Sequence, residues 1–169
     1  MRFKKIICWP PLLGGVGAGV TISILAYITF QSILSGTNYG LWLAASFGSS
    51  VVVVFGYPDN EFAQPKNVLF GHLLCALVGI IFVTLFKITQ DRTIFFLTIG
   101  LAVGLSVMLM MALKITHPPA GGNAIVVMLA QDSFQFLIFP IMVGAITIII
   151  GGIIYNRFIL KKNYPLKWL

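Results

Sequence analysis

The stretch KITHPPAGGNAIVVMLA, residues 114–130, breaks the pattern of an otherwise apolar chain. Pro118 and Pro119 oppose helix formation and have no backbone N–H to donate, and the glycines that follow allow the backbone to approach a neighbour closely. The apolar run after them holds fewer than ten residues, and a helix of about ten residues covers only about 15 Å. This is half of the roughly 30 Å hydrocarbon core of a bilayer. The stretch therefore predicts a half-helix that begins near Gly122 or Asn123 at membrane depth.

Four other stretches are long enough to span a membrane, which takes about 20 mostly apolar residues. They cover about residues 12–34, 68–87, 94–113 and 134–157. Of the 169 residues, 59% are hydrophobic and 9% carry charge, whereas about a quarter of a soluble domain is charged. The composition argues against a soluble enzyme and a nucleic-acid-binding protein. We expect one transmembrane domain over residues 1–169 and no soluble domain.

A second short apolar stretch resembles the first. GSSVVVVF (48–55) aligns with GNAIVVML (122–129) when Gly48 is set against Gly122, and a long apolar stretch follows each. The long stretches have matching glycines in nearly the same register, Gly71 with Gly144 and Gly79 with Gly152.

This order predicts an all-helical fold with two repeats, about 10–88 and 92–160. Each repeat has a long helix, a broken segment with a half-helix, and a long helix. The whole chain then has four full spans and two half-helical segments.

Basic residues cluster at both ends of the chain, which predicts that both termini are cytoplasmic and that the number of crossings is even. The charge count does not distinguish four crossings from six, because either gives nine basic residues inside and two outside. Six crossings would invert the two repeats, as in many transporters. We favour six, because residues 42–56 and 114–130 are each long enough to cross if their first part is extended. The expected location is the cell (inner) membrane.

The starts of the half-helices are candidate anion sites. The first N–H groups of a helix have no intrahelical acceptor, and the helix dipole favours negative charge there. In an inverted repeat the two starts would meet near the membrane midplane, without the cost of a buried Lys or Arg. The candidate substrate-binding residues are Gly48, Ser49, Ser50, His117, Gly121, Gly122 and Asn123.

The two histidines have two interpretations each. An imidazole can donate to an anion or relay a proton, since it titrates near neutral pH; alternatively, it donates to a backbone carbonyl and holds a helix break in place. We favour function for His117 and structure for His72. No metal site is expected, since His72, Cys75 and His117 form only a weak ligand pattern, and no cofactor is expected. The sequence places no nucleophile near a base at a readable spacing, so we expect no enzyme.

Four motifs occur together in this chain: THPPAGGN (116–123), ASFGS (45–49), AQPKNV (63–68) and Gly71-His72. In these motifs the chain resembles the HPP family of integral membrane proteins. That family is described as having four transmembrane helices, and members in cyanobacteria and plant plastids are linked to nitrite transport. By position, the resemblance marks Gly48, Ser49, Gln64, Asn67, His72, His117, Pro118, Pro119, Gly121 and Gly122.

These observations predict a membrane transporter or channel for a small inorganic anion, with nitrite as the first expectation. The expected partners are the anion, the lipid bilayer and a second copy of the chain in a homodimer, with no nucleic acid. Two alternatives stay open. One is transport of another small solute such as formate, and the other is a non-transporting membrane scaffold or partner subunit.

Overall fold

The computed structural model describes residues 9–34, 43–86, 92–130 and 133–168, and these residues form helices and no strand. The α-helices are α1 (Trp9–Leu34), α2 (Leu43–Gly56), α3 (Pro65–Phe86), α4 (Arg92–Ala112), α5 (Gly122–Ala130) and α6 (Val143–Ile153). Short 3-10 turns, η1 (Glu61–Ala63) and η2 (Pro118–Gly121), precede α3 and α5, and π-helical turns, η3 (Leu137–Met142) and η4 (Ile154–Ile159), flank α6. The predicted all-helical fold class is confirmed.

Four helical segments are long and apolar enough to span a membrane: Pro11–Gln31, Pro65–Phe86, Ile94–Ala112 and Leu137–Ile159. They match the four predicted spans. The last one kinks at Phe139 and Pro140, where Phe139 leaves the helical region with φ −128° and ψ 119°, because a proline inside a helix removes a backbone donor and clashes with the preceding turn. Two short apolar helices, α2 and α5, accompany the long ones, as expected.

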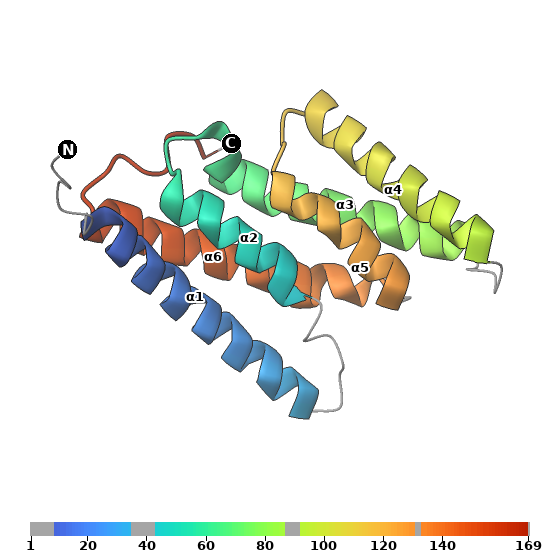
Figure 1. Cartoon of the computed structure of the whole chain (residues 1–169), viewed down its shortest axis with the longest axis horizontal. Coiled ribbons are helices and arrows are strands. Elements are labelled where there is room, and N and C mark those ends of the chain that lie inside the picture. The colour runs from blue at the N-terminus through green and yellow to red at the C-terminus, as the bar shows by residue number, and fades with distance from the viewer. Residues whose placement is uncertain (1–8, 35–42, 87–91, 131–132, 169) are drawn as a thin grey trace, which may run out of the picture.

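The helices lie roughly along one axis, and the chain reverses direction from each described α-helix to the next (Figure 1). α5 packs against α3 and α4, whereas α2 packs against α1 and α6. Helices α3 and α6 contact each other between these two groups. Each short helix therefore packs between two long ones, and one of those two belongs to the other half of the sequence.

The start of α2 differs from the prediction. We expected an extended arm from Trp42 and a helix start near Gly48, but α2 already begins at Leu43; residue 42 lies outside the described part. A glycine inside a helix costs about 1 kcal/mol, and burial of Phe47 and Val51 on the same helix offsets that cost, since each large apolar side chain contributes about 1.5–3 kcal/mol. Gly48 and Ser49 therefore lie inside the helix.

Glycines allow the short helices to approach the long helices of the other half. A Cβ at Gly79 of α3 would lie 2.9 Å from the Ala124 carbonyl oxygen and 3.0 Å from Val127 Cβ, both on α5. On the other side, a Cβ at Gly152 of α6 would overlap the Val54 side chain of α2. The backbones of α3 and α6 thus each touch a short helix directly.

We predict that Gly79→Ala lowers the stability of the protein by about 1–3 kcal/mol, because the added methyl group meets the rigid backbone of α5. The control is Gly100→Ala on the exposed side of α4, where nothing lies within 4 Å of the new Cβ; alanine favours the helix there. Thermal unfolding of the purified protein in detergent measures both effects. Equal unfolding midpoints for the two variants would contradict the close packing of α3 on α5.

Candidate functional site

Four buried polar side chains meet inside the apolar bundle. They are Ser50 of α2, His72 of α3, His117 just before η2, and Asn123 of α5, and each is at most 1% exposed. The centroids of the two imidazole rings lie 5.1 Å apart. We call these four residues the polar cluster. Burial of polar groups is unfavourable unless they are hydrogen-bonded, so their partners decide what the cluster can do.

The Ser50 hydroxyl lies at the centre of the polar cluster. Its oxygen is 2.9 Å from His72 Nε2 and 2.8 Å from His117 Nε2. It also lies 2.9 Å from the carbonyl oxygen of Ser46, one turn earlier in α2. A serine hydroxyl has one proton to donate and two lone pairs that accept, so it donates to only one of these groups at a time.

The outer nitrogens of the two rings define which protons they hold. His117 Nδ1 lies 2.8 Å from the Phe62 carbonyl oxygen, which only accepts, so Nδ1 of His117 has the proton. Asn123 Nδ2 lies 2.8 Å from His72 Nδ1 and also donates to the His72 carbonyl oxygen at 3.2 Å. His72 Nδ1 therefore accepts, and its proton is on Nε2, which donates to Ser50.

Local backbone geometry positions His117. It precedes a proline and is extended, with φ −135° and ψ 98°, as expected for a residue in that position. A Cβ at Gly71 would lie 2.9 Å from His117 Cβ, so the glycine makes room for the histidine against α3. On the other side of the cluster the Phe47 ring contacts the His72 ring, with centroids 4.8 Å apart.

A second set of hydrogen bonds holds the loop before α3 in place. Asn67 Nδ2 donates to the Thr116 carbonyl oxygen at 2.9 Å, which ties α3 to the extended arm that leads to His117. Gln64 Nε2 donates to the Pro58 and Asn60 carbonyl oxygens, each at 2.9 Å. Gln64 Oε1 accepts from the N–H groups of the C-terminal segment at residues 166 and 167. The positions that the motifs marked at Gln64 and Asn67 thus join backbone segments.

Tyr164 of the C-terminal segment supports the same loop. Its hydroxyl donates to the Ala63 carbonyl oxygen at 2.7 Å. Burial raises the pKa of Tyr164, so the hydroxyl keeps its proton and its role as a donor. The last described residues therefore help to fix the segment that supplies the Phe62 carbonyl to His117.

The predicted site is only partly brought together. Ser50, His117 and Asn123 of the predicted binding residues meet in the polar cluster, and His72, expected to be structural, lies there as well. The predicted glycines, Gly48, Gly121 and Gly122, have no side chain to offer the cluster. Ser49 is on an exposed side of α2, since only every third or fourth helical residue shares a face with Ser50.

The prediction that the first backbone N–H groups of the two short helices bind the anion needs a correction. α5 starts at Gly122 as expected, but the Ala120 N–H already donates to the His117 carbonyl oxygen at 2.9 Å, and the Gly122 N–H donates to the Ala120 carbonyl oxygen. Pro118 and Pro119 begin this 3-10 turn and have no N–H. In α2 the corresponding amides lie within the helix. The Ala120 and Gly122 amides are therefore engaged within the turn, and the hydrogen bonds inside the cluster come from side chains.

Sequence reasoning missed the link between Ser50 and the histidines, because it joins residues 22 and 67 positions apart. It also missed the Phe62 carbonyl as the partner of His117. No group of three or more metal-ligating side chains occurs in the described part of the chain. Cys75, one turn after His72 in α3, contacts Met110 Sδ at 3.5 Å.

A pocket of about 470 Å³ lies next to the cluster, and we call it the outer pocket. Its lining residues are Glu61, Phe62, Asn67, Met111, Lys114 and Thr116. Phe62 and Thr116 connect it with the cluster, since the Phe62 carbonyl accepts from His117 and Thr116 is the residue before His117. The outer pocket is thus separated from the imidazole of His117 by the η1 loop and the extended arm.

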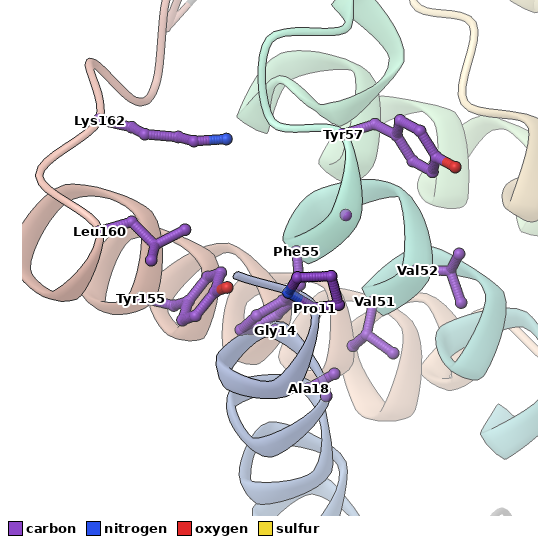
Figure 2. Close-up of a pocket in the computed structure, with 12 residues that line it drawn as sticks. Pro11, Gly14, Ala18, Val51, Val52, Phe55, Tyr57, Tyr155, Leu160 and Lys162 are labelled. Carbon is purple, nitrogen blue, oxygen red and sulfur yellow. The ribbon is translucent and has the colours of Figure 1, made fainter. Parts of the chain in front are cut away.

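Another pocket, of about 430 Å³, lies between α1, α2, η4 and the segment that follows η4 (Figure 2). Side chains such as Val51, Val52 and Phe55 make its wall apolar, and Lys162 lies at one side. None of the four cluster residues lines it. The polar cluster therefore does not open into this pocket.

The profile of the family described as "HPP, transmembrane region" matches residues 6–165. The chain belongs to the HPP transmembrane family. It is similar to two proteins of Dictyostelium discoideum that are each named as a transmembrane protein. One is 34% identical over 151 residues, which cover 87% of this chain and 52% of the relative. The other is 32% identical over 153 residues, which cover 88% and 48%.

This HPP family chain thus spans about half the length of those relatives. No solved structure matches it. The family match and the four spanning helices together identify a multi-pass membrane protein.

We predict opposite tautomers for the two histidines in the neutral state, with the proton on Nε2 of His72 and on Nδ1 of His117. Nitrogen-15 NMR of histidine-labelled protein measures this, and His117→Gln assigns the signals because the chain has two histidines. Asn123→Ala removes the donor to His72 Nδ1 and is expected to mix the His72 tautomers, while Ser106→Ala on α4 is expected to leave them unchanged. The same tautomer on both rings of the unmodified chain would contradict the hydrogen-bond order.

Proposed function

We propose that this HPP family protein moves a small inorganic anion across the membrane, with nitrite as the preferred substrate, and that the anion binds at the polar cluster. The observation that carries the proposal is the set of four buried polar side chains at the junction of α2, α3 and α5. Such groups are costly inside a membrane protein and mark substrate or ion pathways. We propose no catalytic reaction at the site.

The chemistry of the cluster suits a small anion. The oxygens of nitrite accept hydrogen bonds, and the cluster has three neutral donors: the Ser50 hydroxyl, the His72 Nε2–H and the Asn123 amide. To bind the anion, each donor would exchange its present partner inside the cluster for an oxygen of the anion. A transport site must bind firmly enough for entry and weakly enough for release. Neutral donors meet this requirement, whereas a buried Lys or Arg would hold an anion more strongly.

The outer pocket supports a route to the cluster. Lys114 and Glu61 both line it, and the Lys114 ammonium gives an anion a positive group to contact at the entrance. In the described conformation all four cluster side chains are at most 1% exposed. Transport therefore requires a movement of the η1 loop or of the arm at Thr116, and the Asn67–Thr116 hydrogen bond would break in that movement.

Reciprocal packing supports an inverted repeat as part of this proposal. On α3, Gly79 faces Val127; on α6, Gly152 faces Val54. Gly79 and Gly152 are separated by the same number of residues as Val54 and Val127. One alignment of the two halves therefore relates both contacts. The alternating helix directions (Figure 1) agree with this relation. In transporters with inverted repeats, one repeat moves against the other, and the central site opens first to one side of the membrane and then to the other.

The same register applies to another glycine pair. Gly71 faces Ala120, and Gly144 faces Phe47. The same alignment sets Gly71 against Gly144 and Phe47 against Ala120, so it relates these two contacts as well. This register is shifted by a single position from the motif alignment, and it places Ser50 and Asn123 at equivalent positions. Both residues contact His72, so each half would supply one polar side chain to the site from its short helix.

Formate or another small solute fits the same donors and stays an alternative substrate. A non-transporting scaffold subunit is the other alternative, in which the polar cluster would only hold the helices together. The orientation with cytoplasmic termini in the cell membrane, and the homodimer, belong to the proposal as well.

We expect the purified protein in proteoliposomes to take up nitrite, with Ser50→Ala and Asn123→Ala each lowering the initial rate about 10-fold or more. Each substitution removes a donor, and a hydrogen bond to a charged group contributes about 1.5–3 kcal/mol. Ser106→Ala is the matched control, since Ser106 is equally buried but bonds to the Ala102 carbonyl oxygen of its own helix and to Cys75, and to none of the four cluster residues.

Nitrate and formate serve as competing substrates in the same assay. Failure of nitrite, nitrate and formate to move would contradict the proposed function. Equal loss in the Ser106 variant would point to a general effect of removing buried hydroxyl groups.

A further inference from the structure

We infer that the polar cluster takes up one proton with each anion, on Nε2 of His117, so that the protein cotransports a proton and a monovalent anion. This inference rests on the proposed function and names its coupling ion. It comes from counting the protons and acceptors around Ser50.

In the neutral cluster every proton has a place. His117 uses its Nδ1 proton on the Phe62 carbonyl at 2.8 Å, so its Nε2 has a lone pair that faces Ser50 at 2.8 Å. The Ser50 hydroxyl donates to that lone pair and accepts from His72 Nε2–H at 2.9 Å. The Ser46 carbonyl then receives no proton from Ser50.

An added proton finds an equally complete arrangement. Placed on His117 Nε2, it forms an N–H that donates to the Ser50 oxygen, and the Ser50 hydroxyl proton rotates to the Ser46 carbonyl oxygen at 2.9 Å. The Ser50 oxygen then accepts from both imidazoles with its two lone pairs. The same heavy-atom positions satisfy both protonation states, so the proton binds without rearrangement of the backbone.

His72 is the poorer acceptor of the added proton. Its free lone pair is on Nδ1, where Asn123 Nδ2 donates at 2.8 Å. A proton there would face the Asn123 amide donor and force the amide to turn, which would also break the bond from Asn123 to the His72 carbonyl. The asymmetry of these hydrogen bonds assigns the proton to His117.

The charged cluster lacks a counter-charge in the described part of the chain. Asp59 and Glu61, the two carboxylates among the described residues, form no ion pair with either ring. From the packed elements, α2 presents Ser46, Phe47 and Ser50, α5 presents Asn123, and the arm presents backbone carbonyls. Cys75, one turn beyond His72, contacts Met110, while Glu61 and Lys114 line the outer pocket.

A bound anion supplies the missing charge. A buried cation without a partner is strongly unfavourable, and an anion next to His117 removes most of that cost. By linkage, the proton then strengthens anion binding by the same factor as the anion strengthens proton binding. One proton and one monovalent anion sum to zero charge, so each transport cycle is electrically neutral.

The test uses proteoliposomes of the full chain, with nitrite and, separately, formate as the probe. A potassium gradient with valinomycin sets the membrane potential, and an internal pH dye counts protons. Protein-free vesicles correct for the acid forms that cross the bilayer unaided. A potential of about 100 mV would change the equilibrium accumulation of an uncoupled anion about 50-fold, whereas we expect less than a 2-fold change and one proton per anion.

The outcomes separate the inference from the function it rests on. Anion flux that follows the potential and moves no protons overturns proton coupling and leaves the proposed transport intact. No flux of nitrite, nitrate or formate overturns both. His117→Gln, checked by gel filtration for correct folding, is expected to lose proton uptake, while Ser106→Ala keeps it. A folded His117→Gln variant that still takes up one proton per anion overturns the assignment to His117.

Discussion

The Ser50 hydroxyl, shared between two imidazoles, is the interaction on which the arrangement of this bundle depends. It joins α2 to α3 and to the arm before α5, three segments that are distant in the sequence. Because buried polar groups are stable only when they are paired, the three segments have to meet at this point for the Nε2 atoms of both histidines to be satisfied. The surrounding apolar contacts are less specific, since many Val and Ile positions could exchange neighbours at small cost.

The close approach of backbones follows from this requirement. Side chains as short as serine and asparagine reach the histidines only if α2 and α5 lie against the long helices, and glycines at Gly71 and Gly79 leave the space. The glycines thus serve the polar cluster as well as the packing. The loop before α3 adds the remaining partner, because the Gln64, Asn67 and Tyr164 bonds hold the Phe62 carbonyl in reach of His117.

The long spans and the start of α5 could be predicted from the sequence, because hydropathy and the Pro118–Pro119 pair determine them locally. The start of α2 could not, since a glycine penalty competes with the burial of Phe47, and burial depends on partners elsewhere in the chain. The kink at Pro140 was hidden within an apolar run of adequate length. Ser50, His117 and Asn123 were found as single candidates, but their convergence with His72 depends on tertiary contacts that no spacing reveals.

The bare backbone on the contact faces of α3 and α6 also affects mobility. Where two helices meet through protruding side chains, these side chains interdigitate. Sliding one helix along the other then requires the side chains to pass over each other. At Gly71 and Gly79, α3 has no side chain that protrudes toward the segment of η2 and α5. The contact face of α3 is therefore smooth at these positions. The hydrogen bonds from Asn123 to His72 at the N-terminal end of α5 are then the directional contacts that fix the position of α5 along α3.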